Sequence, residues 1–320
     1  MKTFLKNMAA AWQAIPEILK NLKSLNSSSS KYQDILAELQ IDNYLLENLH
    51  KNPKYDNPRK INRYEFKVFS QAGEDGIISE IFNRNRYEFK VFSQAGEDGI
   101  ISEIFNRIGT TNKFFVEFGV GNGLENNSTY LLVKGWQGYW IEGSERFCKS
   151  IRQSFEDLLA NQQLTLKNTF ITAANIEDLF REGNVPTELD LLSIDIDGND
   201  YWVWQAITNY RPRVVILEYN AIYPPESSWV MQYNPSHQWK YNSHMGSSLK
   251  ALEKLGHQKG YKLIGCSFSG VNAFFVREDL LADHFCSPFS AENHYEPARY
   301  FLCSQKAGHP RTFGKFKTIE

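Results

Sequence analysis

The feature that most constrains the fold of this chain is a regular alternation of strand-like and helix-like segments from residue 114 onward. The strand-like runs end at Glu117, Glu142, Phe170 to Thr172, Ile196 and Glu218, and helical patterns such as residues 147–159 and 201–207 lie between them. Such alternation predicts an α/β fold with a mainly parallel, doubly wound sheet. Residues 261–277 instead predict two strands joined by a turn at Ser269-Gly270, so we expect an antiparallel hairpin at the end of the sheet.

A glycine-rich turn after the first strand indicates a ligand site. The run FFVEFGVGNG, residues 114–123, predicts a strand buried on both faces that is followed by Gly119, Gly121 and Gly123. Such glycines let the backbone approach a ligand, although an ordinary strand-to-helix turn has the same pattern. Glu117 and Glu125 would repel a diphosphate, whereas a cationic or zwitterionic ligand such as S-adenosylmethionine tolerates both. Glu142, at the end of the second strand, has the spacing of a carboxylate that binds ribose hydroxyls.

Composition excludes two broad classes of function. The chain has 35 Lys and Arg against 37 Asp and Glu, so it lacks the concentrated basic field that nucleic-acid binding needs. It has no apolar run of about 18 residues and no signal-type block at its N-terminus, so we expect no transmembrane segment and no export by a signal peptide. The four cysteines are widely spaced and outside metal-binding patterns, which predicts reduced thiols in a cytoplasmic protein.

The first 61 residues have a different pattern from the rest. Apolar residues recur at helical spacing on both sides of a Ser-rich hinge at residues 25–30, which predicts two amphipathic helices. Their polar faces are not strongly basic, so packing on the main domain or on a second subunit is favoured over a role at a membrane surface. A homodimer through these N-terminal helices is consistent with that pattern.

An internal repeat follows this arm, because residues 62–84 recur without a change as residues 85–107. Structural repeats drift in sequence and need about three copies to bury a core, so this identity indicates a recent duplication or an assembly error. The link to the first strand is short, so we expect the second copy, with Gln94 and Asp98, to hold the functional place. Docking of the first copy is the alternative. The predicted division is therefore an arm (1–61), an extra copy (62–84), a main domain (85–285) and a tail (286–320).

Acidic and amide side chains crowd the end of the strand near residue 196. They are Asp195, Asp197, Asn199 and Asp200. An unpaired buried charge costs several kcal/mol, so such a cluster usually faces solvent, a cation or hydrogen-bond donors, although a helix cap can account for one member. Asp197 could join Glu218 and Asn220 of the next strand end as oxygen ligands of Mg²⁺. Plain substrate binding is the alternative.

Six segments in their order along the chain resemble the FkbM-type S-adenosylmethionine-dependent methyltransferases, over residues 87–280. The segments are FSQAGEDGIISEIF, FVEFGVGNGLENNSTYLL, GWQGYWIEG, LLSIDIDGNDYWVWQAI, VVILEYNAIYPP and GYKLIGCSFSGVNAFFVREDL. The resemblance implies a Rossmann-like class I methyltransferase fold with a C-terminal antiparallel hairpin. It also implies O-methylation, often of a sugar or a secondary metabolite.

The resemblance assigns cofactor contacts to particular residues. Those for the methionine part of S-adenosylmethionine are Glu117, Gly119, Gly121 and Gly123. Glu142 would bind the ribose, and Asn175 and Ile176 would lie near the adenine. Asp195 and Asp197 would border the crevice where the methyl group is transferred. Gln94 would also contact the cofactor, but it belongs to the duplicated block, where the chain departs from the family pattern.

The sulfonium is already an activated methyl donor, so the protein needs only to align an acceptor hydroxyl and remove its proton. Candidates for the base are Asp197, His237 and His244. Both histidines lie in an aromatic insertion, residues 223–245, that we expect to cover a small-molecule or glycan acceptor; a surface role is the alternative. Two rival functions remain: a nucleotide-sugar glycosyltransferase that holds a divalent metal with Asp195 and Asp197, and a non-catalytic scaffold with a methyltransferase-like sheet.

Overall fold

The computed structural model describes residues 96–300 continuously, the backbone of residues 316–318, and a few separate residues before them (40, 44, 47, 48, 52, 53, 57, 59–61 and 93). The chain divides into two units, Met1–Lys54 and Tyr55–Glu320, and the description below concerns the second. Most of the predicted arm, the whole first copy of the repeat and Gln94 lie outside the described residues. The predictions made for them therefore stay predictions.

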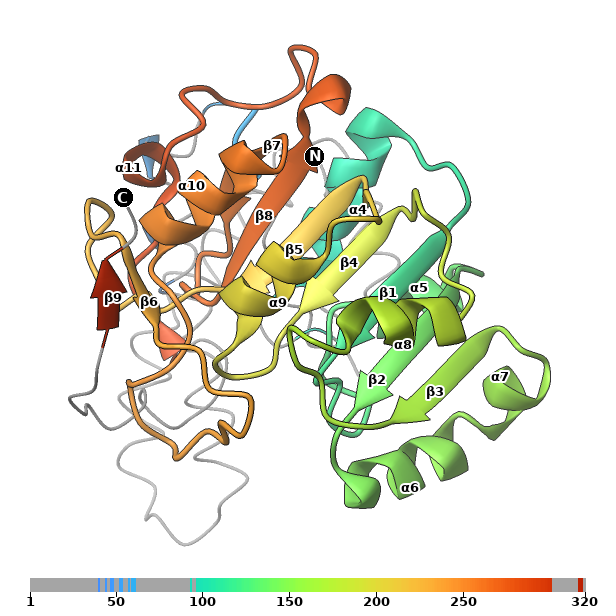
Figure 1. Ribbon diagram of the computed structural model, residues 1–320. Coiled ribbons are helices and arrows are strands. Elements are labelled where there is room, and N and C mark those ends of the chain that lie inside the picture. Colours follow the sequence, from blue (N-terminus) through green and yellow to red (C-terminus); the bar gives the residue numbers. More distant parts are fainter. Residues whose placement is uncertain are drawn as a thin grey trace, which may run out of the picture. The chain divides into compact units, whose positions relative to one another are not determined.

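Seven strands form the central sheet in the order β3-β2-β1-β4-β5-β8-β7 (Figure 1). They are β1 (Phe114–Phe118), β2 (Gln137–Glu142), β3 (Leu164–Asn168), β4 (Leu191–Ile194), β5 (Val214–Glu218), β7 (Tyr261–Cys266) and β8 (Asn272–Arg277). Strands β1 to β5 pair in parallel, whereas β8 is antiparallel to both β5 and β7. This confirms the predicted Rossmann-like sheet of class I methyltransferase type with its antiparallel hairpin. The strand order reverses between β1 and β4, where such sheets bind ligands.

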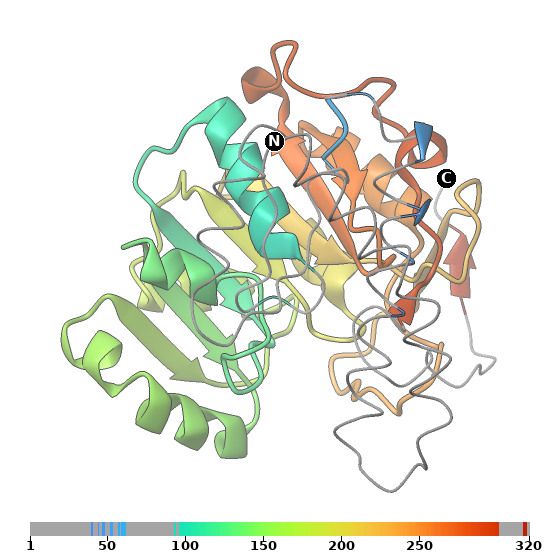
Figure 2. The ribbon, with the colours of Figure 1, turned by 180° about the vertical axis from the view of Figure 1, so that it is seen from behind.

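Helices cover both faces of the sheet, as Figures 1 and 2 show from opposite sides. On one face α8 (Ile176–Glu182), α9 (Asp200–Ala206) and α10 (Leu249–Gln258) bury their apolar sides in one core cluster. On the other face α4 (Glu97–Ile108), α5 (Thr129–Val133) and α6 (Glu145–Ser154) contribute to a second cluster. The remaining short helices are α7 (Glu156–Ala160), the 3₁₀ helix η4 (Glu278–Leu280) and α11 (Ala291–His294). Alternate apolar residues of β2, β5 and β8 belong to opposite clusters, as expected for strands buried on both faces.

The second copy of the repeat forms helix α4. Its Ile100, Ile101 and Ile104 are buried in the cluster on that face of the sheet. Gly109 ends the helix with a left-handed φ of 69°, and its N–H bonds to the carbonyl of Phe105. The apolar face of the second copy is therefore part of the core of this domain.

Two strand ends differ from the sequence-based expectation. β3 ends at Asn168, before Phe170, because its only partner, β2, ends at Glu142, which is the register partner of Asn168. β4 ends at Ile194 rather than at Ile196, because the main-chain N–H of Ile196 is bonded to the Asp200 carboxylate. The helical pattern 147–159 is divided between α6 and α7, and α9 begins one residue earlier than expected.

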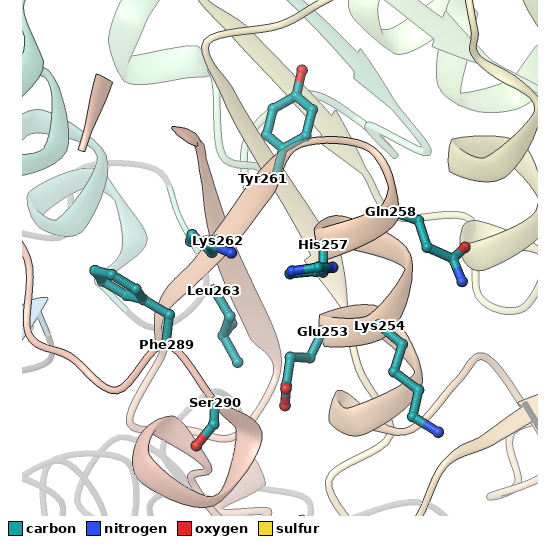
Figure 3. Close-up of a pocket in the computed structure, with 9 residues that line it drawn as sticks. All are labelled: Glu253, Lys254, His257, Gln258, Tyr261, Lys262, Leu263, Phe289 and Ser290. Atoms are coloured by element: carbon teal, nitrogen blue, oxygen red, sulfur yellow. The ribbon is translucent and has the colours of Figure 1, made fainter. Parts of the chain in front are cut away.

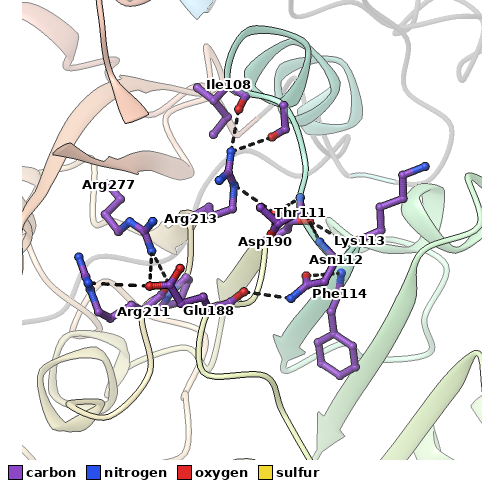
Figure 4. Close-up of polar contacts among 12 residues, drawn as sticks. Ile108, Thr111, Asn112, Lys113, Phe114, Glu188, Asp190, Arg211, Arg213 and Arg277 are labelled. Carbon is purple, nitrogen blue, oxygen red and sulfur yellow. Dashed lines mark hydrogen bonds and ion pairs between the residues drawn. The ribbon is translucent and has the colours of Figure 1, made fainter. Parts of the chain in front are cut away.

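Asp190, which is completely buried, ties the start of β4 to the turn before β1 (Figure 4). Its carboxylate accepts hydrogen bonds of 2.7 to 3.1 Å from the main-chain N–H groups of Thr111, Asn112 and Lys113. From the start of β5, Arg213 Nε lies 3.1 Å from Asp190 Oδ1, and the same guanidinium donates to the carbonyl of the last residue of α4. These contacts fix the spacing of β1, β4 and β5 at the edge opposite their carboxyl ends.

A second sheet has two antiparallel strands. One is β6 (Trp229–Met231), from the insertion between β5 and α10, and the other is β9 (Phe316–Thr318), which follows the main domain in the sequence. Among the described residues, none of the helices is long and apolar enough to cross a membrane. Cys148, Cys266 and Cys286 are buried.

Candidate functional site

A cavity of about 230 Å³ opens at the carboxyl ends of β1 and β4, beside the first residue of β8. Its lining residues are Glu117, Gly119, Val120, Gly121, Asn122, Glu125, Asn126, Asn127, Phe147, Asp195 and Asn272. The structure thus brings the glycine-rich turn and Asp195 together at the switch point of the sheet, as the sequence predicts. Every ionisable side chain in this lining is acidic.

The turn after β1 depends on close approach of two main-chain segments. Gly119 has a left-handed φ of 65°, and a Cβ at this position would lie 1.7 Å from the main-chain oxygen of Asp195. Only glycine lets the exits of β1 and β4 lie this close. Gly121 follows with its N–H donating to Glu142 Oε2 at 2.9 Å, which links the turn to the end of β2.

Glu117 is 2% exposed and its carboxylate is surrounded by donors from the chain itself. Oε1 accepts from the N–H of Asn127 at 2.9 Å and from Ser193 Oγ at 3.2 Å, while Oε2 accepts from both the N–H and the hydroxyl of Ser128. Burial raises the pKa of Glu117 to about 7 despite these hydrogen bonds. The side chain lines the cavity and also holds the loop before α5 against the sheet.

Asn126, in the same loop, lines the cavity and has a buried side-chain amide. Its Oδ1 accepts a hydrogen bond from the hydroxyl of Thr129, which orients the amide. Its Nδ2 is buried and has no hydrogen-bond partner within the described part of the chain. Sequence reasoning did not assign a role to this residue, because its orientation depends on the fold of the loop.

Glu142 lies at the end of β2, where both of its oxygens contact main-chain donors. Oε2 accepts from Gly121 and Oε1 from the N–H of Ser144 at 2.7 Å. Burial raises the pKa of Glu142, and these hydrogen bonds oppose that shift. Next to it, the ring of Phe170, which is 64% exposed, lies over Gly143: a Cβ there would be 2.7 Å from the ring.

The residues predicted near the adenine occupy different environments. Asn175 uses its side chain locally, because Oδ1 accepts from the N–H of Thr172 and Nδ2 donates to the carbonyl of Phe170. Ile176 is completely buried in the core beneath the sheet. It therefore has no exposed surface with which to contact a ligand in this structure.

The loop between β4 and α9 is held by its own polar residues. Asp200 accepts 2.9 Å hydrogen bonds from the N–H groups of Ile196 and Gly198, and Asn199 pairs its side-chain amide with the main chain of Asn234. Two of the four polar residues of this segment therefore have structural roles. The other two, Asp195 and Asp197, have no such structural hydrogen bond to their carboxylates within the described residues and lie at the crevice. Asp197 has a left-handed φ of 55°.

One carboxylate oxygen from each of Asp195, Asp197 and Glu218 lies within 4.8 Å of the other two. Burial raises the pKa of Asp197 to about 6, and burial together with the neighbouring carboxylates raises the pKa of Asp195 and of Glu218 well above the ordinary range. Asp197 and Glu218 of the predicted oxygen set thus lie together, and Asp195 joins them. Asn220 donates from Nδ2 to the carbonyls of Ser243 and Met245, so its part in the predicted set stays a prediction.

The insertion between β5 and α10 is tied to the site. His237 Nε2 lies 3.2 Å from the main-chain oxygen of Asp197, and a Cβ on Gly198 would lie 2.4 Å from the His237 ring. Burial lowers the pKa of His237, and nearby His244 lowers it further. The hydroxyl of Tyr233 accepts a hydrogen bond from the N–H of Ala173, in the loop before α8. Both predicted histidines thus belong to a segment attached to the acidic loop.

The second copy of the repeat reaches the site through the start of α4. Ser93 and Asp98 exchange hydrogen bonds between side chain and main-chain N–H, which caps the helix. Glu97 Oε1 accepts from Asn272 Nδ2 at 3.2 Å. Asn272 is a lining residue that the sequence did not reveal, because only the register of β8 on β5 places it opposite Glu218.

A larger hollow, of about 460 Å³, lies away from these residues (Figure 3). It lies between α10 and the start of β7 and includes His257, Tyr261 and Phe289. Both β5 and β7 are antiparallel to β8, so the start of β7 is at the sheet edge opposite the acidic crevice. Ligands of such sheets bind at the carboxyl ends of the parallel strands, so this hollow is not the candidate active site.

No protein-family model and no curated protein matches the chain. Solved structures with a similar fold include an S-adenosylmethionine-dependent methyltransferase from Clostridium acetobutylicum, with 12% identity over 65% of this chain and 99% of that chain and a TM-score of 0.36. The glycopeptide N-methyltransferase MtfA has 15% identity over 57% and 96% of the two chains and a TM-score of 0.37. The O-methyltransferase from Bacillus cereus in complex with SAH has 16% identity over 57% and 73%, and a TM-score of 0.33. Likenesses this weak do not assign an activity, and the fold stated above rests on the strand order and pairing.

Proposed function

We propose that this protein is an S-adenosylmethionine-dependent methyltransferase that methylates a hydroxyl group of a sugar or another small-molecule acceptor. The observation that carries the proposal is the charge of the cavity at the switch point: its ionisable lining residues are Glu117, Glu125 and Asp195. A diphosphate would be repelled there, whereas a ligand with sulfonium and ammonium groups would be attracted.

The residues present fit this cofactor in two further respects. The buried Nδ2 of Asn126 is a donor without a partner among the described residues, so it would suit the carboxylate of the methionine part. Glu142 would accept from ribose hydroxyls, because its two oxygens offer about four lone-pair sites and the main-chain N–H groups of Gly121, Gly143 and Ser144 do not fill all of them. The cavity is smaller than usual ligand pockets of about 300–1,000 Å³, so the remainder of the cofactor would lie along the open rim near Phe170.

When bound, the cofactor supplies a methyl group that is already activated for transfer to oxygen. The chain then has to orient the acceptor hydroxyl, exclude water and remove one proton. His237 is the better candidate for the base than Asp197, because its lowered pKa keeps the imidazole neutral at neutral pH. His244 lies in the same insertion, which would cover the acceptor.

The first test is binding of S-adenosylhomocysteine, measured by calorimetry and by thermal shift. Glu142→Ala should weaken binding at least about tenfold, since charged hydrogen bonds contribute about 1.5–3 kcal/mol. Glu145→Ala is the matched control, because this carboxylate is three residues away but exposed and paired with Arg152. Asn126→Asp should also weaken binding, because it replaces the free donor with a charge that repels the cofactor carboxylate.

The rival functions predict different results. Stabilisation by a nucleotide-diphosphate sugar with Mn²⁺, but not by S-adenosylhomocysteine, would favour glycosyl transfer. No stabilisation by either ligand would favour a non-catalytic scaffold. Incubation with labelled S-adenosylmethionine and a panel of glycans and hydroxylated small molecules would then identify the acceptor by transfer of label to oxygen.

A further inference from the structure

The three carboxylates Asp195, Asp197 and Glu218 come from two adjacent strand ends and converge on one point. One oxygen of each lies within 4.8 Å of the other two. Glu218 is 9% exposed, and its Oε2 is buried without a hydrogen-bond partner in the described part of the chain. A buried carboxylate oxygen is very costly without a donor or a cation, so this group of acids has an unmet requirement for positive charge.

A second buried acceptor lies beside Glu218. Asn272 is its register partner across β5 and β8, so both side chains lie on the same face of the sheet. Asn272 donates from Nδ2 to Glu97, which leaves Oδ1 pointing elsewhere, and this oxygen is buried without a partner among the described residues. Two neighbouring buried acceptors without donors are difficult to explain by packing alone.

The described part of the chain supplies no ion-pair partner to the three carboxylates. Within the described residues, Asp195, Asp197 and Glu218 take part in none of the ion pairs, although twelve other acidic residues do. Glu117 and Glu142, by contrast, receive main-chain N–H groups. The requirement for positive charge is therefore specific to the three carboxylates.

We propose that Asp195, Asp197 and Glu218 bind one divalent cation of the Mg²⁺ or Mn²⁺ type. Around such an ion, oxygens at about 2.1 Å are separated from one another by about 3 to 4 Å, and the grouping of the three oxygens within 4.8 Å allows this spacing. Carboxylate oxygens are the hard ligands that these ions prefer. A sulfonium group is a poorer occupant, because it is screened by its own carbon substituents and cannot contact three oxygens directly.

This site does not require the protein to be a methyltransferase. Where the proposed function also holds, Asp197 would hold the ion with its carboxylate, while its main-chain oxygen lies 3.2 Å from Nε2 of His237, the candidate base. A divalent ion there would lower the pKa of an acceptor hydroxyl that it coordinates.

The test is direct titration of the full-length protein with Mn²⁺, in the absence of any cofactor, with free Mn²⁺ followed by electron paramagnetic resonance. We expect one ion per chain, competition by Mg²⁺, and at least a tenfold loss of affinity in both Glu218→Gln and Asp195→Asn. Glu145→Gln is the matched control, because this carboxylate lies outside the group, is exposed and is paired with Arg152, and it should leave Mn²⁺ affinity unchanged.

Binding of S-adenosylhomocysteine is measured on the same samples and on Glu142→Gln. Glu218→Gln should retain it and Glu142→Gln should weaken it, so failure of the metal site and failure of the proposed function are distinguishable. Glu218→Gln removes repulsion, so in metal-free buffer we expect it to melt no lower than the unmodified protein, which separates loss of binding from loss of folding. The proposal would be overturned if the protein bound no Mn²⁺ at concentrations up to roughly 1 mM, which is the weak end of biological divalent-cation sites. It would also be overturned if Glu218→Gln and Asp195→Asn both bound Mn²⁺ as tightly as the unmodified protein.

Discussion

Gly119 and Gly121 provide a sharp test of how closely β1 and β4 approach each other at the site. Both have left-handed backbone, with φ of 65° and 56°. A Cβ on Gly119 would lie 1.7 Å from the main-chain oxygen of Asp195, whereas a Cβ on Gly121 would have no heavy atom within 4 Å. Substitution of each by alanine therefore imposes the same backbone strain but a very different steric demand.

The two substitutions should differ by several kcal/mol in the free energy of unfolding. Left-handed backbone costs about 1–2 kcal/mol for a residue with a Cβ, and this is the whole expected effect of Gly121→Ala. Gly119→Ala would in addition place the new Cβ 1.7 Å from the main-chain oxygen of Asp195. Real Cβ atoms essentially never lie closer than 3.0 Å to such an atom. Overpacking in a core costs about 1–3 kcal/mol where side chains can move. Here the neighbour is main chain at a strand end, so we expect a total of about 4 kcal/mol or more.

Urea unfolding followed by tryptophan fluorescence measures both variants under the same conditions. Gly119→Ala should also reduce binding of S-adenosylhomocysteine, because relief of the contact displaces Asp195 from the cavity. If the two variants differed by less than about 1 kcal/mol, the strand ends could separate at little cost, and the account of a rigid turn at the switch point would be refuted.

Three further predictions concern the rest of the molecule. Asp190→Asn should destabilise the fold by about 3–5 kcal/mol in urea unfolding, because it leaves the nearly buried guanidinium of Arg213 without its carboxylate; a loss below about 1 kcal/mol would contradict this. Burial raises the pKa of Glu117 to about 7 in the folded protein, from an ordinary value of 4.5. Protonation of this carboxyl therefore stabilises the fold, fully below pH 4.5, and the stabilisation is lost as the pH rises through 7. The free energy of unfolding should therefore be lower at about pH 8 than at about pH 5, by up to about 3 kcal/mol from this group, and Glu117→Gln should reduce the difference. If His237 is the base, His237→Ala should lower kcat about 10²- to 10⁴-fold and leave S-adenosylhomocysteine affinity unchanged; equal losses in both would indicate a structural role.

The sheet could be predicted from sequence because its signals are local. Apolar runs that alternate with helical patterns specify parallel strands, and the turn at Ser269-Gly270 specifies the hairpin. The ends of β3 and β4 were misplaced because they depend on distant groups. The length of β2 decides where β3 ends, and the Asp200 carboxylate removes Ile196 from the ladder. A strand end is set by its partners, which a single sequence does not specify.

The convergence of acids on one crevice was predictable for the same topological reason, since parallel strands bring their carboxyl ends together. The hydrogen-bond partners of the individual side chains were not. Asn220 follows β5 as directly as Glu218 does, but its amide is bound to carbonyls more than twenty residues away. Asn272 enters the site only through the register of an antiparallel strand whose position in the sheet is non-local.

The distribution of hydrogen-bond donors divides this acidic crevice into two parts with different requirements. Around Glu117 and Glu142 the chain itself provides main-chain N–H groups, which offset part of the cost of burying these carboxylates. Glu218 and its two neighbours lack such donors within the described residues, so their charge is balanced only by an added cation or by protons. An organic ligand with one sulfonium group supplies less positive charge than the three clustered carboxylates carry. The two proposals therefore assign different occupants to the two parts, and because Asp195 belongs to both, substitutions of Glu142 and Glu218 are the ones that separate them.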